Sequence, residues 1–187
     1  MAAALLLLLL LASCLPSGGP AIPEPQHRQQ RLLRSSFAEA WRAARAVVGD
    51  SRLRITEEDE SAGLLRAGLR KRRRTDREEL ARDLLRIAKI EDAKRQGLQD
   101  VSEYLVAYTI ELAHVDEEAT RLEVSTRITA VDRSEAILVG PGFVQVIPRN
   151  FDVPSNGVLE RELVSGIGGR LFISEEMLYY FGALGRD

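Results

Sequence analysis

The chain has 187 residues, with 26 Lys and Arg against 28 Asp and Glu, a formal net charge of -2 and a single cysteine. This near balance of charge gives no overall electrostatic basis for binding nucleic acid or an acidic partner. A single cysteine excludes an internal disulfide, so the fold depends on its hydrophobic core alone, unlike that of small disulfide-rich extracellular modules.

The chain begins with an apolar run, residues 1–14, that ends in Leu-Ala-Ser-Cys14. The run is shorter than the about 20 apolar residues that a membrane-spanning helix needs, and helix-breaking residues follow it, so we interpret it as a signal peptide. Its last four residues resemble the bacterial lipobox, in which the cysteine is acylated and the chain is cleaved just before it. The resemblance implies that Cys14 is the lipid attachment residue, carrying fatty acids such as palmitate. Several acyl chains would make a lasting membrane anchor.

Two alternatives follow from the same residues. Signal peptides normally start with positive charge, but residues 1–4 contain no Lys or Arg, so the signal could begin upstream of Met1. Cleavage after Cys14 as in an ordinary signal peptide would instead release a secreted protein. With an anchor, Leu15 occupies the place where aspartate would favour inner-membrane retention in enteric bacteria. The expected location is therefore the periplasmic face of the outer membrane.

Residues 15–34 are rich in Pro, Gly and Gln in their first part and are expected to form a flexible tether. The remainder, residues 35–187, is long enough for one domain with a core of its own. We expect this to be a single α+β domain.

The domain opens with the pattern of a helix followed by a β-hairpin. Ser36 and Glu39 form a capping box, apolar residues such as Phe37 and Trp41 recur on one helical face, and Gly49 ends the helix. Alternating residues then predict strands over 52–56 and 63–69, joined by a polar turn.

Residues 70–97 interrupt this pattern with a charged insertion that is expected to be helical. Thr75 and Glu78 form a second capping box, and Leu80 and Leu84 begin an apolar face. The insertion starts with five basic residues: Arg70, Lys71, Arg72, Arg73 and Arg74. Such a run can contact anionic lipid head groups or an acidic partner. Alternatively, it is a solvated loop whose charge is offset by the acidic residues that follow.

The strongest strand signal lies in residues 103–112 and 121–130, where apolar and polar residues alternate strictly in both segments. This period of two predicts an antiparallel hairpin with one face in water. We expect glutamates of the first arm to face arginines of the second.

The remaining elements are shorter. Gly140-Pro141-Gly142 predicts the turn of a small, very hydrophobic hairpin, and Pro148 and Pro154 bound an expected coil. A helix is expected from Val158 to about Phe172, followed by a separate short helix over 174–184.

Together these elements predict an α+β fold: an antiparallel sheet of about four main strands, covered on one face by the N- and C-terminal helices. The lipobox at Cys14, the helix-then-hairpin signature of residues 37–67 and the later hairpin and helix resemble the small periplasmic lipoproteins of bacteria with helix-grip-like domains. One example is the repeated domain of BamC, a component of the outer-membrane assembly machinery. The resemblance implies an accessory or scaffold role, although the charged insertion of residues 70–97 departs from the compact members.

No residue pattern predicts catalysis, a metal site or a cofactor. His27 and His114 are isolated, with no second His or Cys at metal-ligand spacing, and no Gly-x-Ser-x-Gly occurs. Gly166-Ile167-Gly168-Gly169 superficially resembles a phosphate loop, but it lacks a suitable lysine and follows a helix. These residues are therefore expected to form a close helix-packing surface or a frayed helix end. The acidic turns at 57–60 and 116–118 lack the spacing of a calcium loop.

The first functional hypothesis is therefore a non-enzymatic, lipid-anchored envelope protein whose domain is an interaction or scaffold module of a membrane-associated complex, with a protein partner and no nucleic acid. The alternative is a secreted or anchored carrier that binds a small apolar ligand between sheet and helix. The aromatic residues that would line such a site, Phe37, Trp41, Tyr104 and Tyr108, are equally suited to the core.

Overall fold

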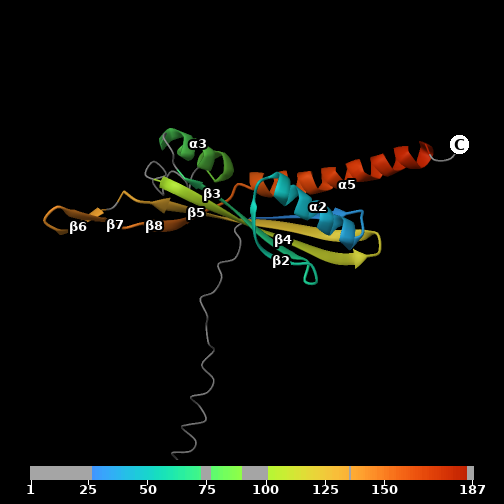
Figure 1. Ribbon diagram of the computed structural model, residues 1–187, viewed down its shortest axis with the longest axis horizontal. Coiled ribbons are helices and arrows are strands. Elements are labelled where there is room, and N and C mark those ends of the chain that lie inside the picture. The colour runs from blue at the N-terminus through green and yellow to red at the C-terminus, as the bar shows by residue number, and fades with distance from the viewer. Residues whose placement is uncertain (1–26, 73–76, 90–100, 135, 185–187) are drawn as a thin grey trace, which may run out of the picture.

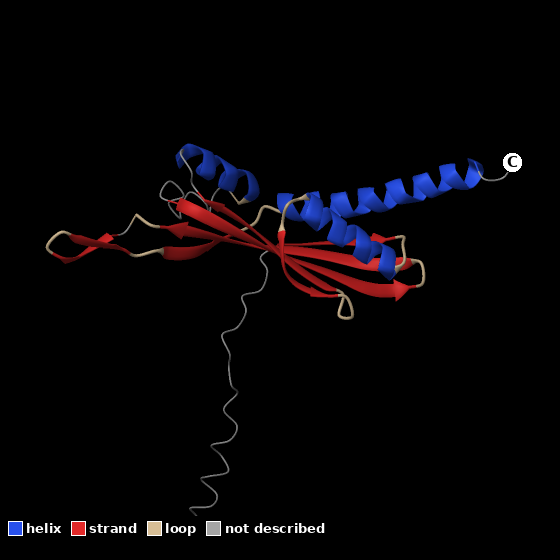
Figure 2. Ribbon diagram, in the orientation of Figure 1, coloured by secondary structure: helices blue, strands red, loops and turns tan. Residues whose placement is uncertain are grey.

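The computed structural model describes residues 27–72, 77–89, 101–134 and 136–184, and side chains of α5 (Val158–Leu184) only as far as Phe172. The fold is α+β, as predicted. In the described residues, three helices lie on one side of the main sheet (Figure 1, Figure 2). Residues 1–26, which contain Cys14, lie outside the described residues, as do Arg73, Arg74 and Thr75.

The main sheet has six strands, all paired antiparallel, rather than the four expected. Its order is β1-β5-β4-β3-β2, and β8 pairs with β5 beyond the end of β1. The strands are β1 (His27–Leu33), β2 (Arg54–Asp59), β3 (Leu64–Arg72), β4 (Val101–Asp116), β5 (Ala119–Asp132) and β8 (Arg149–Val153). A separate two-stranded sheet consists of β6 (Ala136–Gly140) and β7 (Phe143–Val146), the small hairpin predicted around Gly140-Pro141-Gly142.

The long β4–β5 hairpin confirms the alternation read from the sequence. The predicted apolar face of β4 is buried under the helices, and its side chains are Tyr104, Val106, Tyr108, Ile110 and Leu112. The predicted pairing of glutamates with arginines across the hairpin is wrong, because Glu111 lies opposite Glu123 in the observed register. Glu123 finds its partners on β1 instead, where its carboxylate accepts hydrogen bonds from Arg28 and Gln30.

Helix α2 (Phe37–Asp50) begins at the predicted capping box. The Ser36 backbone N–H donates to the Glu39 carboxylate at 3.1 Å, and the Glu39 N–H donates to the Ser36 hydroxyl. The Ser36 hydroxyl also donates to the Glu39 carboxylate, at 2.8 Å, and this bond, followed by the one from the Ser36 N–H, lowers the pKa of Glu39. Trp41 is buried, with its ring stacked on that of Phe37. The helix thereby covers the sheet through the face that the apolar spacing predicted.

The glycine run of α5 is a packing surface. A methyl group at Gly166 would lie 3.2 Å from Val47 of α2, and one at Gly168 would lie 2.9 Å from the Arg31 guanidinium of β1. Glycine therefore lets α5 approach α2 and β1 closely. This agrees with the packing interpretation of residues 166–169.

The strand β1 corrects the predicted tether, which included residues 27–34. Its sequence is too polar to signal a strand, but its backbone pairs with β5 along its whole length, from His27 opposite Thr126 to Leu33 opposite Thr120. An edge strand depends chiefly on the backbone groups that its neighbour offers, so polar side chains do not prevent it.

Two further boundaries differ from the prediction. The expected coil between Pro148 and Pro154 contains β8, which extends the edge of β5 where β1 stops. The two expected C-terminal helices are one continuous helix, α5. A serine such as Ser174 is only weakly unfavourable inside a helix, so it does not have to start a new one. Figure 1 shows α5 continuing past the end of the sheet.

The inserted helix α3 (Arg77–Ile87) confirms the helical part of the insertion over those residues, and residues 90–100 lie outside the described part of the chain. Its apolar face, including Leu80, Leu84 and Ile87, is buried in the core. The same core includes the inner faces of α2 and α5. One hydrophobic core therefore serves the whole described domain.

Candidate interaction surface

The β6–β7 hairpin exposes most of its large apolar side chains to water. They are Ile137, Leu138, Val139, Phe143, Val144 and Val146, followed directly by Ile147. Leu138 and Phe143 have exposed fractions of 77% and 75%. Residues 136–147 contain no charged side chain. Contiguous exposed apolar surface of this kind is uncommon on soluble domains and is typical of interaction sites.

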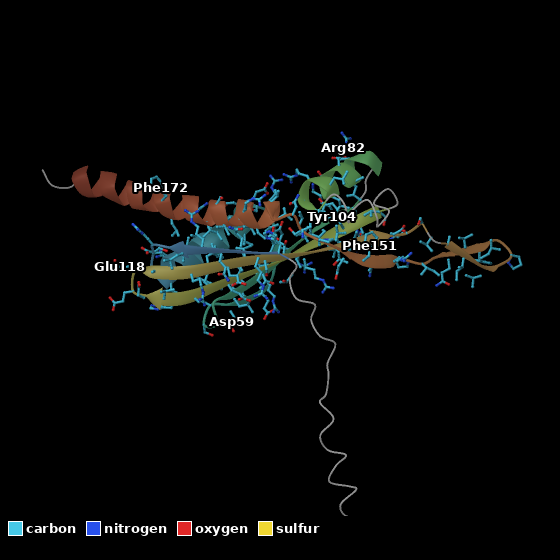
Figure 3. The ribbon with its side chains drawn as sticks, turned by 180° about the vertical axis from the view of Figure 1, so that it is seen from behind. Asp59, Arg82, Tyr104, Glu118, Phe151 and Phe172 are labelled. Carbon is cyan, nitrogen blue, oxygen red and sulfur yellow. The ribbon has the colours of Figure 1, made fainter. Side chains whose placement is uncertain are left out.

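The hairpin projects from one end of the main sheet (Figure 1). In Figure 3 it extends beyond Phe151 of β8, while Glu118, in the turn between β4 and β5, lies at the opposite end of the sheet. Successive residues of a strand point to opposite faces, so the consecutive exposed residues 137–139 make both faces of the hairpin apolar. The hairpin therefore offers apolar surface on both sides, away from the core.

The predicted basic run is divided between the two faces of the sheet. Lys71 points to the helix side, where its ammonium group pairs with Asp83 of α3 at 2.5 Å. Arg70 and Arg72 lie on the face that carries no helix, and both guanidinium groups contact Glu103 of β4. Of the three described residues of the run, Arg70 and Arg72 therefore lie together, and Lys71 lies on the opposite face.

Glu103 is at the centre of an arginine cluster. It is only 4% exposed, although it lies on the face of the sheet without helices. Arg70 binds it through two nitrogens, at 2.9 and 3.2 Å, Arg72 donates at 2.9 Å, and Arg133 approaches at 3.4 Å. The hydrogen bonds from Arg70, then its positive charge and the contacts from Arg72, lower the pKa of the Glu103 carboxyl despite its burial.

Arg133 connects this cluster to the hairpin. It lies between the end of β5 and the start of β6, at the root of the projecting hairpin. Together with Arg72, Ser102 and Glu103 it lines a cavity of about 310 Å³. No local sequence pattern singles out Arg133 or Glu103, because their contact depends on the register of β3, β4 and β5.

No protein-family model matches the chain, and a search of curated proteins finds no similar sequence. None of the described helices combines the length and hydropathy that crossing a membrane requires.

The predicted apolar-ligand site coincides with the core. Trp41, Tyr104 and Tyr108 are at most 4% exposed and belong to the main hydrophobic cluster, with Phe37 packed against it. Burial raises the pKa of both tyrosines strongly. None of the four lines the larger surface cavity of about 660 Å³, which lies around Ser36 and the β4–β5 turn. A carrier function stays a prediction.

The two histidines lie far apart in the fold. His27 starts β1, and its Nδ1 atom is buried without a hydrogen-bond partner among the described residues, whereas His114 is exposed near the end of β4. Within the described ranges, no three His, Cys, Asp or Glu side chains are grouped so as to hold a metal ion.

A second buried acid, Glu160, was also not predicted from the sequence. Glu160 of α5 is fully buried and accepts hydrogen bonds from the hydroxyls of Thr126 and Ser155, the latter at 3.0 Å. Its position was readable, because it falls three and seven residues before the apolar Leu163 and Ile167 on the same helical face. The two hydroxyls satisfy a group that burial would otherwise penalise, so Glu160 connects α5 to the sheet.

Proposed function

We propose that the protein is a non-enzymatic, lipid-anchored component of the cell envelope, held at the periplasmic face of the outer membrane through Cys14. Its domain serves as an interaction or scaffold module of a membrane-associated complex. The observation that supports the interaction role is the projecting apolar β6–β7 hairpin. The proposed anchor rests on the resemblance of Leu-Ala-Ser-Cys14 to the lipobox.

The hairpin is better suited to a protein partner than to the interior of a bilayer. A two-stranded ribbon has open edges with unpaired backbone N–H and C=O groups, and hydrocarbon offers these groups no hydrogen bonds. A protein groove can cover both apolar faces and can also pair with an edge by strand addition. The exposed side chains of Leu138 and Phe143 would then be the main apolar anchors.

The proposal assigns no catalytic step to the domain. Several charged groups on the sheet face without helices are engaged with one another. Arg66 pairs with Glu57 at 2.6 Å, and Arg127 pairs with Asp152 at 2.8 Å. We assign these pairs to the solvated face of the sheet and propose no catalytic role for them.

The anchor is tested by replacing Cys14 with Ala and fractionating cells of a bacterium that processes lipoproteins. We expect C14A to leave the membrane fraction, because the thiol is the only acylation point of the proposed lipobox. S13A, which keeps a small residue before the cysteine, is the matched control and should stay membrane-bound. Unchanged membrane association of C14A would refute the anchor.

The docking surface is tested by placing a photo-crosslinking residue at Phe143 and, as control, at Val115. Val115 is also an exposed apolar residue, with an exposed fraction of 53%, but it lies at the far end of β4. We expect a defined protein adduct in native membranes from position 143 and none from position 115. The substitution L138D should abolish that adduct. Adducts with lipid alone, or equal adducts from both positions, would contradict a protein partner.

A further inference from the structure

We propose that Arg72 and Arg133 form a binding site for a phosphate group at the root of the β6–β7 hairpin, with Arg70 and Glu103 as positioning residues. The site lies on the face of the sheet without helices. It goes beyond the proposed function, because it depends neither on Cys14 nor on the apolar side chains of the hairpin.

Among the described residues, the charges of the cluster do not cancel. Other ion pairs of this face join one arginine to one carboxylate, as in Arg66 with Glu57. Glu103 instead contacts three guanidinium groups, from Arg70, Arg72 and Arg133. Arg70 alone neutralises the carboxylate through a two-nitrogen contact, so Arg72 and Arg133 add two positive charges that Glu103 does not offset.

Arg72 and Arg133 each have N–H donors that Glu103 does not use. A guanidinium group carries five N–H donors, and the Glu103 carboxylate takes one nitrogen of Arg72 and one nitrogen of Arg133. The Arg133 contact is long, at 3.4 Å, and both side chains are more than half exposed. Planar guanidinium groups match the oxygens of phosphate in a two-point contact, which suits them to this anion.

A cavity beside the cluster offers space for a ligand, and the side chains that line it are held in place by hydrogen bonds. The cavity of about 310 Å³ between Arg72 and Arg133 is also lined by Ser102 and Glu103. Ser102 is fixed by its hydroxyl, which donates to the backbone carbonyl of Val131 at 3.0 Å. Because the buried Glu103 already holds the arginines in place, binding an anion costs less side-chain ordering than on a mobile surface.

The phosphate group could come from a lipid head group or from a soluble phosphate, and both present the same oxygens to the arginines. The proposal is tested with the full chain by titrating inorganic phosphate against chloride in a calorimeter. Cosedimentation with vesicles of phosphatidylglycerol and of phosphatidylcholine forms a second arm. We expect phosphate binding that R72A and R133A each weaken about tenfold, the loss typical of one charge-assisted contact.

The matched control is R66A, which removes an arginine from the same strand and the same face but from a balanced pair. It should bind phosphate as the unmodified chain does. Arg133 is about half exposed, so R133A is expected to fold, and its thermal unfolding verifies this.

The calorimetric and the vesicle measurements together distinguish a lipid head group from a soluble phosphate. Weakening by R72A and R133A in both arms supports a site for phosphate in general, and weakening with phosphatidylglycerol vesicles alone supports a lipid head group. The proposal is overturned if the unmodified chain prefers neither phosphate nor phosphatidylglycerol. It is equally overturned if R66A weakens binding as much as R133A does, because binding then reflects nonspecific charge.

Discussion

Glu103 makes the stability of the domain depend on pH. Its carboxyl has a lowered pKa in the folded protein, first because Arg70 donates hydrogen bonds to it and then because of the nearby positive charges. A group whose pKa is lower when folded stabilises the protein at pH values above its unfolded pKa of about 4.3. That contribution is lost as the pH falls through the folded pKa.

We therefore expect E103Q to lower the free energy of unfolding by about 1–3 kcal/mol at neutral pH, the range for a lost charged hydrogen bond. The deficit should shrink toward zero at pH values below the folded pKa, where the unmodified residue is also neutral. Denaturant unfolding at pH 7 and in an acidic series measures both.

The matched control for Glu103 is E57Q. Glu57 pairs with one arginine, and both partners are about half exposed, so this change should cost at most about 1 kcal/mol at neutral pH. A deficit of E103Q that is the same at acidic and neutral pH would show that the charge of Glu103 does not contribute.

At the scale of single residues, the sequence shows which charged residues are present but not which of them pair with one another. The basic run of residues 70–74 is evident in the sequence. Which of its side chains pairs with Asp83 on the helix side and which with Glu103 on the other face is decided by the alternation of side chains along β3. Arg133, which follows directly after the end of β5, joins the same carboxylate. Such a cluster requires the registers of three strands, which no local pattern contains.

Among the elements, the β2–β3 hairpin depends on one glycine. Gly63 has a φ of 67°, and a methyl group built on it would lie 2.0 Å from the backbone oxygen of Leu112. Its own carbonyl accepts a hydrogen bond from the Leu112 N–H at 2.8 Å. The turn therefore lies directly against β4, in a conformation that favours glycine.

We expect G63A to lower the free energy of unfolding by about 2–4 kcal/mol, because both the left-handed conformation and the contact with β4 oppose a side chain. Chemical denaturation gives this value.

The control for Gly63 is G49A in α2, where a methyl group meets nothing within 4 Å. Alanine there should be neutral or stabilising by up to about 1 kcal/mol, as helix propensity requires. Equal effects of the two substitutions would contradict the tight packing of the β2–β3 turn.

The elements that sequence predicted well are those with a strong periodic pattern and one buried face, namely α2 and the β4–β5 hairpin. The strands β1 and β8 were missed for a common reason. Both pair with the same edge of β5, one beyond the other, through backbone hydrogen bonds. Their side chains do not alternate regularly between apolar and polar, so a search for that alternation does not find these strands.

For the whole molecule, the α+β architecture with helices on one face was predictable, because an antiparallel sheet with one apolar face needs cover. The projection of the β6–β7 hairpin was not. The sequence of residues 136–147 predicts a turn between two short apolar strands. That pattern is the same for a hairpin that packs on the core and for one that projects from it. Membership of a BamC-like family and the envelope location stay predictions.

We expect the double substitution of Leu138 and Phe143 by Asp to leave the free energy of unfolding within about 0.5 kcal/mol of the unmodified value, since both side chains stand outside the core. The same change should reduce concentration-dependent self-association, because it places charge on both arms of the apolar hairpin. Unfolding and analytical ultracentrifugation measure the two effects.

The control for the hairpin is the double substitution of Leu65 and Ile110 by Asp, which introduces charge at two fully buried positions and should prevent folding. A large loss of stability in the hairpin variant would instead mean that the hairpin packs on the domain.

The first residue of β1, His27, limits the reach of the domain under the proposed anchor. If Cys14 carries the lipid, only the about 12 residues between Cys14 and β1 separate the bilayer from the sheet, and even fully extended they span no more than about 40 Å. A tether running to residue 34 would have reached about 70 Å. The distance between the domain and the membrane surface would thus be limited to the length of this segment. A partner would have to present its groove within that distance, which favours proteins that are themselves embedded in or seated on the same membrane.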